Sequence, residues 1–564
     1  MPKPLHVVVL IASLLAAAAL RDAHAASKDW FHDRQKKTVC TITVNSSDEK
    51  AAFRRSLPAD KYRFVELVER GRPDWLASAC QQHVRCDVLV ISGHYDGRDE
   101  FYSDRPGVSD FLPVEEMERA SCSASCSGLF SQLKEVYLFG CNTLNPEALK
   151  RYSGEVARSL VRAGHPPAEA ERLARSIVQL NGGSSRDRVR LIFDHVPVIY
   201  GFSAKAPLGP VAASMLSSYF RSGGGAEVGR GRVSRKLLAS FAPTSMAVSS
   251  GIGPTEPLAA LRASVCQFSD DALAPAQKLA FVHRLLEGDM ADVRPFLDRI
   301  EKTVGSLSDA ERGTAPVAKV LDEIARDAAA RSRFLAFARD ADAPSTRARM
   351  VKLAGALGWL SQDGERSELV ALIGDRLAAS VSPADVDLAC RLDDDHRLES
   401  ALPALVASIP APFSVGQSAI LACLGSAEAR ARVVPALLSV RDSDFQMADV
   451  YLRHRPLTDA QLRDLTADIA NAEDARVQVR ALDALAAQHL TDPASLRELA
   501  RLFPVAQTPG VQVAIAGVLL RSDYESIATP ELVQSLRESR LDPRGRSEVV
   551  DALIRRLEAG VSGS

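Results

Sequence analysis

The sequence lacks a predominant charge of either sign. Its 69 lysine and arginine side chains are balanced by 71 aspartate and glutamate side chains, which leaves a formal net charge of −2 over 564 residues. Recognition of nucleic acid or of an anionic membrane through long-range electrostatics requires a basic surface. We therefore expect no nucleic acid partner and no electrostatic attachment to a membrane.

Long hydrophobic runs are scarce as well. The uncharged stretch from Val7 to Leu20 follows Lys3 and has fourteen residues, fewer than the roughly 20 that a membrane-spanning helix needs. The small residues of "AHA" at 23–25 suit cleavage by a signal peptidase. Residues 1–25 are therefore predicted to be a removed signal peptide, in preference to an anchoring helix.

The longest uncharged stretch lies at 400–427, and it contains Pro403, Pro410 and Pro412. Prolines at these positions favour two buried helices joined by a turn over a membrane span. The prediction is an exported bacterial protein, periplasmic or secreted, without a transmembrane anchor.

Several catalytic and binding motifs are absent. The glycine-rich segment 221–232 has no Gly-Lys-Ser/Thr ending, so it is not a phosphate-binding loop. No Gly-x-Ser-x-Gly elbow of a serine hydrolase occurs, nor does the early Cys-Gly-x-Cys of papain-type enzymes. The sequence implies no cofactor.

The chain has nine cysteines. In an oxidising compartment such residues pair as disulfides. The alternative is a zinc site with ligands from Cys80, His83, Cys86, Cys122 and Cys126. Thiolates and an imidazole at the spacings of these residues suit a tetrahedral ion. Disulfides are favoured because of the predicted export, and the pairing among Cys40, Cys80, Cys86, Cys122 and Cys126 stays open.

Strand-like and helix-like segments alternate over the first part of the chain. This alternation predicts an α/β domain at 26–240, a parallel sheet with helices on both faces. The predicted strands are 38–46, 61–69, 86–93, 135–140 and 196–204. Glycine, serine and proline then dominate, and 241–257 is predicted to be an interdomain linker.

Amphipathic helical segments follow one another from 258 to 564. "VQVRALDALAA" begins at Val477 and "VQVAIAGVLLR" at Val511, an interval of 511 − 477 = 34 residues. An interval of this size is typical of helical repeats. These helices resemble HEAT-type repeats, which implies a solenoid that binds a protein partner. A plain helical bundle is the alternative.

Two of the predicted strands end beside a reactive side chain. "VLVISGHYDG" at 88–97 carries His94, and "VYLFGCNT" at 136–143 carries Cys141. Catalytic groups collect at the carboxyl ends of parallel strands. A neighbouring imidazole can activate a thiol as a nucleophile and later protonate a leaving amine. Backbone N–H groups at tight glycine turns can hold a developing oxyanion.

The histidine precedes the cysteine by 141 − 94 = 47 residues, close to the roughly 50 of caspase-type peptidases. Over about residues 38–220 the chain resembles the caspase-like clan of cysteine peptidases, clan CD, with its caspases, CHAT-domain proteases, gingipains and separases. The resemblance implies endopeptidase activity on a protein or peptide substrate through a thioester, with His94 as base and acid and Cys141 as nucleophile.

Further roles follow from the same resemblance. Gly93, Tyr95 and Gly140 would support the oxyanion through their backbone, although the clan usually has glycine directly after the histidine, where Tyr95 stands here. The pocket for the substrate side chain would involve Asp96 and the segment that helps form this pocket in the clan. In this chain that segment corresponds to Tyr200, Gly201, Phe202 and Ser203.

Two simpler interpretations remain. Cys141 on its own fits a small buried side chain, or a partner of Cys122 or Cys126 in a disulfide. The alternative function is accordingly a non-catalytic scaffold or binding protein, with a peptidase-like domain and a helical solenoid as its working part.

Overall fold

The computed structural model describes residues 36–67, 76–97, 100–103, 111–147, 153–180, 183–542 and 548–563. The predicted signal peptide, residues 1–25, lies outside this part of the chain. Contacts divide the chain into two compact units, Met1–Phe337 and Ala338–Ser564. Each unit is described by itself.

A six-stranded sheet forms the centre of the first unit, with the strand order β2-β1-β3-β7-β8-β9. The first five strands in this order are parallel to their neighbours, and β9 is antiparallel to β8. The strands are β1 (Lys37–Thr43), β2 (Tyr62–Glu66), β3 (Val88–Ser92), β7 (Glu135–Phe139), β8 (Val198–Phe202) and β9 (Met246–Ser249). The parallel sheet predicted from the sequence is confirmed.

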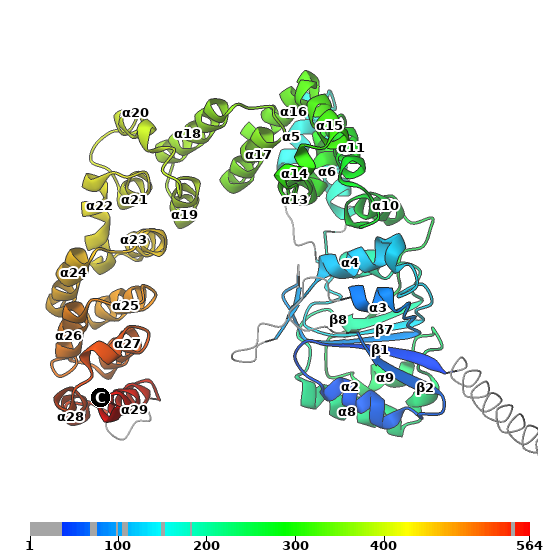
Figure 1. Ribbon diagram of the computed structural model, residues 1–564, viewed down its shortest axis with the longest axis horizontal. Helices are drawn as coiled ribbons and strands as arrows, with labels where there is room; N and C mark the ends of the chain where they lie inside the picture. Colours follow the sequence, from blue (N-terminus) through cyan, green and yellow to red (C-terminus); the bar gives the residue numbers. More distant parts are fainter. Residues whose placement is uncertain are drawn as a thin grey trace, which may run out of the picture. The chain divides into compact units, whose positions relative to one another are not determined.

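Both faces of this sheet are buried, as is usual for parallel sheets. Along β3, Leu89 and Ile91 pack into the core on one face, and Val88 and Val90 into the core on the other. Figure 1 shows the two helical layers that cover these faces. One layer holds α3 (Ala77–Gln81), α4 (Val114–Cys122) and α7 (Ser185–Ile192), and the other holds α2 (Asp48–Ser56), α8 (Gly209–Arg221) and α9 (Arg235–Ser240).

A small antiparallel sheet follows β3 directly. It consists of β4 (His94–Tyr95), β5 (Glu100–Tyr102) and β6 (Phe111–Pro113) in that order. None of the strands predicted from the sequence lies in this segment. Two inward side chains, Phe101 and Leu112, are buried and join the core above β3, which explains why this segment is ordered into strands.

The glycine-rich segment 221–232 wraps around a carboxylate of the same domain. Glu135 is buried at the start of β7, and it accepts hydrogen bonds from the N–H groups of Gly229 (2.8 Å), Arg230 (3.0 Å) and Gly231 (3.0 Å). Gly229 and Gly231 have φ angles of 71° and 67°, and residues other than glycine adopt such angles only at a cost in free energy. The glycine-rich segment therefore binds a carboxylate of the protein itself.

The segment 241–257, which the sequence predicted to be a linker, packs against the α/β domain. It contains β9, the edge strand of the main sheet, and the N–H of Gly251 donates to the carbonyl of Val196 at 2.8 Å. A Cβ atom on Gly251 would overlap the carbonyl of Phe193. The glycine and serine content thus allows close backbone packing against the domain rather than a free connection.

The helices that follow also belong partly to the first unit, so the division lies about eighty residues beyond the predicted boundary at 257. A disulfide joins Cys122 to Cys266, and the Arg299 guanidinium binds both oxygens of the buried Glu118 (2.7 and 2.8 Å). The predicted boundary depended on a change of composition, whereas the observed one depends on the disulfide and the buried ion pair that join α4 to the following helices.

The remaining helices of the first unit are α5 (Ser153–Arg162), α6 (Pro167–Leu180), α10 (Leu258–Ser269), α11 (Pro275–Leu286), α12 (Met290–Val293), α13 (Leu297–Gly305), α14 (Asp309–Arg312) and α15 (Ala315–Arg326), while α16 (Ala328–Arg339) crosses the division. The second unit is helical throughout its described part. Its longer helices are α17 (Pro344–Ala356), α18 (Gln362–Ala378), α19 (Pro383–Leu392), α21 (Val415–Cys423), α23 (Asp442–His454), α24 (Asp459–Asn471), α25 (Ala475–Ala486), α26 (Pro493–Leu502), α27 (Pro509–Leu520), α28 (Pro530–Glu538) and α29 (Glu548–Gly563), and α20 (Leu402–Ala407) and α22 (Ala427–Val433) are shorter.

Alternate helices of the second unit contact one another. Contacts join α25 to α27 and α27 to α29, and likewise α24 to α26, so that the two sets follow one another on opposite sides in Figure 1. The 34-residue interval has a structural counterpart: Gln478 donates to the carbonyl of Ile469 and Gln512 to that of Phe503, both at 3.0 Å. Each of these pairs is offset by 34 residues from the other.

Candidate functional site

The carboxyl ends of β3 and β7 lie side by side. Ser92 is the last residue of β3 and pairs with Phe139, the last residue of β7. The hydrogen-bonded ladder goes one residue further, because the N–H of Gly93 donates to the carbonyl of Phe139 at 3.2 Å. His94 and Cys141 each come two residues after the paired residues, so the strand register, 139 − 92 = 47, equals the interval between them, 141 − 94 = 47.

Cys141 is the free cysteine of the chain. The other eight cysteines form the disulfides Cys40–Cys86, Cys80–Cys126, Cys122–Cys266 and Cys390–Cys423. The prediction of disulfides is confirmed, and the pairing, which the sequence left open, includes partners distant in the sequence. A zinc site on the cysteines near His83 is excluded, because a sulfur in a disulfide is not a thiolate ligand.

The Cys141 side chain is half-buried and has a backbone donor next to it. The N–H of Ala206 donates to Cys141 Sγ at 3.3 Å. Such a donor complements negative charge on sulfur. Since Ala206 follows β8, the loop after a third strand contributes to the surroundings of this thiol.

The turn after Cys141 is fixed to β8. Asn142 has φ of 58°, in the left-handed region, and its N–H donates to the carbonyl of Ala204 at 2.7 Å. The Thr143 hydroxyl donates to the carbonyl of Gly140 (3.2 Å) and accepts from the N–H of Phe202 (3.0 Å). A non-glycine residue in this conformation is uncommon and is maintained only by its surroundings.

His94 begins the small antiparallel sheet. It pairs with Tyr102 on β5, and the two rings lie 5.4 Å apart at 30°. The imidazole is half-buried. The same turn thus ends the parallel strand, begins the antiparallel one and positions the histidine beside an aromatic ring.

Gly93, Gly140 and Tyr95 approach one another closely. A Cβ atom on Gly140 would lie 2.9 Å from Tyr95 Cβ and 3.0 Å from the carbonyl oxygen of Gly93. Tyr95 is buried and packs against Phe101, with 4.8 Å between the ring centroids. Directly after His94 this chain therefore has a core aromatic side chain, and Tyr95 requires glycine at position 140 across from it.

The predicted pocket residues separate into two groups. The side chains of Tyr200 and Phe202 lie in the core, where Tyr200 accepts from the N–H of Ser234 at 2.7 Å. Their side chains are therefore not available to line an open pocket. Gly201 lacks a side chain, and a Cβ there would meet Thr143 Oγ1 at 2.6 Å.

Asp96 and Ser203 have more open positions. Asp96 is exposed, and its carboxylate accepts from the N–H of Glu100 at 3.2 Å in the turn before β5. Ser203 is half-buried and donates to the carbonyl of Ser245 at 3.3 Å. Their role in a substrate pocket stays a prediction.

Sequence reasoning did not identify Asn142 or Thr143 as parts of this site, nor the contact between the N–H of Ala206 and the thiol. Asn142 and Thr143 directly follow Cys141 in the sequence, and this position could have indicated that they belong to the site. The contribution of Ala206 is a backbone N–H brought in by the fold, for which the sequence holds no signal.

No helix in the described ranges is both long and apolar enough to cross a membrane. The four disulfides fit an oxidising compartment. In comparisons with known proteins, no protein-family model matches the chain, and no curated protein shows significant similarity to it.

Proposed function

We propose that the protein is an exported cysteine endopeptidase with a His94–Cys141 dyad. The observation that supports this most directly is the register of β3 and β7, which brings the two residues to matching positions at neighbouring strand ends. That eight of nine cysteines are oxidised while the one at the strand end is a thiol adds to the case. The α/β domain would belong to the caspase-like type.

The proposed chemistry is acyl transfer. The Cys141 thiolate attacks the substrate carbonyl, the carbon–sulfur bond forms, and the oxyanion is held by the backbone N–H of Cys141 with a second donor near Tyr95 or Asp96. The His94 imidazolium then protonates the leaving amine as the peptide bond breaks. A water molecule, deprotonated by His94, hydrolyses the thioester and restores the thiol.

An electrophilic peptide probe tests this proposal. We expect the wild-type protein to be labelled at Cys141, as located by peptide mapping, and His94→Ala to be labelled much more slowly although its thiol is intact. Cys141→Ala is the blank, and its disulfides and circular dichroism should match the wild type. Equal labelling of the wild type and His94→Ala under native conditions would contradict a dyad.

For the second unit we propose a HEAT-like solenoid that binds a protein substrate or partner. The repeated glutamine contacts of α25 and α27 and the contacts between alternate helices support this proposal.

The alternative function is a scaffold protein without catalytic turnover. It is favoured by Tyr95, which stands where the clan usually has glycine. A truncation between α16 and α17, after Asp340, separates the two: loss of partner binding with retained Cys141 labelling supports a peptidase with a recruiting module.

A further inference from the structure

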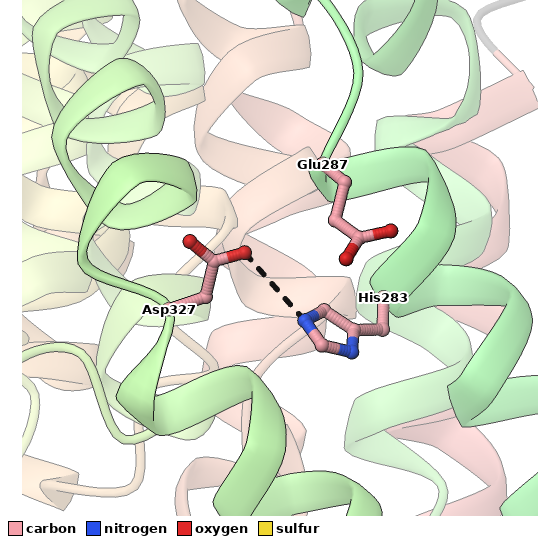
Figure 2. Close-up of side chains that lie close together, drawn as sticks. All are labelled: His283, Glu287 and Asp327. Atoms are coloured by element: carbon pink, nitrogen blue, oxygen red, sulfur yellow. Dashed lines mark ion pairs between the residues drawn. The ribbon is translucent and has the colours of Figure 1, made fainter.

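We propose that His283, Glu287 and Asp327 bind one Zn²⁺ ion in the helical part of the first unit. His283 lies on α11, Glu287 directly follows that helix, and Asp327 lies between α15 and α16. The potential ligand atoms of the three side chains are all within 4.8 Å of one another. Figure 2 shows both carboxylates directed toward the imidazole ring.

The imidazole carries the strongest indication of a ligand. His283 Nε2 is buried and has no hydrogen-bond partner among the described residues. The nearest charged oxygen, Asp327 Oδ2, is 3.6 Å away, which is longer than a hydrogen bond. A buried ring nitrogen without a partner is unfavourable, and a metal ion between these two atoms would satisfy it.

Asp327 is held in place for this role by its other oxygen. Asp327 Oδ1 accepts from the N–H of Ala330 at 2.9 Å, at the start of α16. The second oxygen faces His283, as Figure 2 shows. A ligand carboxylate that is oriented by a backbone N–H loses less freedom on binding, which is the usual contribution of residues behind a metal ligand.

The spacing on α11 also fits. His283 and Glu287 are four residues apart, so they project from the same side of the helix end. One cation lies close by: Arg333 donates from Nη2 to the carbonyls of Leu286 (3.3 Å) and Glu287 (2.9 Å). These carbonyls at the end of α11 offset part of the positive charge of Arg333. The carboxylates of Glu287 and Asp327 therefore remain to balance the charge of a divalent ion.

The ligand types select the ion. Zn²⁺ accepts imidazole and carboxylate together and commonly has three protein ligands with water as the fourth. Ca²⁺ requires about six to eight oxygen ligands, more than this group supplies. The bound ion would connect α11 to the junction of α15 and α16.

A second group of the same composition provides the control. Asp393, His396 and Glu399 in the second unit are also near one another. There, however, His396 Nδ1 is 2.6 Å from Glu399 Oε1, so these atoms already pair. We expect substitution of His396 to leave zinc binding unchanged.

Zinc titration of the full chain tests the proposal. The protein is treated with a chelator, dialysed and titrated with ZnCl₂ alone, in a Cys141→Ala background that removes the free thiol as a competing ligand. We expect one bound zinc per chain by calorimetry and elemental analysis, and a rise in Tm on addition of zinc. His283→Gln and Asp327→Asn should each weaken binding by at least roughly tenfold.

Asparagine is a good helix cap, so Asp327→Asn retains the start of α16 and keeps the test valid where His283→Gln folds poorly. His396→Gln should bind zinc as the unsubstituted background does. Absence of stoichiometric zinc, or binding that persists in both His283→Gln and Asp327→Asn, would overturn the proposal. So would loss of binding in His396→Gln alone.

Discussion

The N–H of Gly93 donates to the carbonyl of Phe139, and this bond joins the residue before His94 to the strand that leads to Cys141. It extends the β3–β7 ladder past the last residue of each strand. The positions of the histidine and the cysteine are therefore consequences of the sheet, and changes that disturb this edge should affect both residues together.

Gly140→Ala should disrupt the strand-end site. Its new Cβ would lie 2.9 Å from Tyr95 Cβ and 3.0 Å from the Gly93 carbonyl, so the backbone on either side must move. Overpacking of this kind costs about 1–3 kcal/mol, and labelling of Cys141 should slow. Gly517→Ala on α27 is the matched control: its Cβ meets nothing within 4 Å, and it should stabilise by about 0.5–1 kcal/mol. Chemical denaturation and probe labelling measure both effects, and an unperturbed Gly140→Ala protein would contradict the packing described.

Thiol titration should find one reactive thiol in the oxidised, denatured chain and nine after reduction, since eight of the nine cysteines are paired. Cys122→Ser with Cys266→Ser removes the bond that closes a separation of 144 residues between α4 and α10. We expect a loss of about 2–5 kcal/mol in the free energy of unfolding. More than one thiol in the oxidised protein would contradict the pairing.

Glu135→Gln should destabilise the α/β domain. Three backbone N–H groups and the Tyr137 hydroxyl (2.8 Å) donate to this carboxylate. An amide presents one acceptor and one donor to a site that offers only donors, and hydrogen bonds to a charged group contribute about 1.5–3 kcal/mol each. Urea denaturation should show a loss of several kcal/mol, and proteolysis within 221–232 should accelerate. Unchanged stability would mean that the glycine segment does not depend on the anion.

Glu49 should make stability depend on pH. It is buried on α2, one of its oxygens has no hydrogen-bond partner among the described residues, and burial raises its pKa above the ordinary value of 4.5. With the pKa raised in the folded state, the folded protein retains the proton longer, so this residue lowers stability as pH rises above 4.5. Glu49→Gln should therefore stabilise at pH 7 by about 1–3 kcal/mol, with no gain well below pH 4.5. A gain that is the same at both pH values would contradict this assignment.

Strands of the parallel sheet such as β3 and β7 could be predicted from the sequence because the apolar runs 88–91 and 136–139 end at or just before a glycine. Helix α2 and strand β9 could not, since their segments are polar or rich in small residues and acquire order from packing on the sheet. The helices of 258–337 were predicted as a separate part, whereas they belong to the first unit. Their place in the first unit depends on contacts between residues far apart in the chain, such as Glu118 and Arg299, and such contacts produce no local pattern in the sequence.

For the candidate site, the sequence singled out two residues whose chemistry is intrinsic to their side chains, His94 and Cys141, and their role as a dyad stays a prediction. Groups that act through the backbone, such as the N–H of Ala206, depend on the course of the loop after β8. The resemblance placed Tyr200 and Phe202 near the pocket, whereas both side chains are buried in the core on the same face of the sheet.

The most direct test of the account is the rate at which an alkylating reagent modifies Cys141 as a function of pH, in wild type and in His94→Ala. An isolated thiol reacts mainly above its ordinary pKa of about 8.5. If His94 activates the thiol, wild-type Cys141 should react rapidly already near neutral pH, and His94→Ala should react slowly there and approach the wild-type rate only in alkaline solution. Superimposable rate profiles for the two proteins would contradict a catalytic dyad.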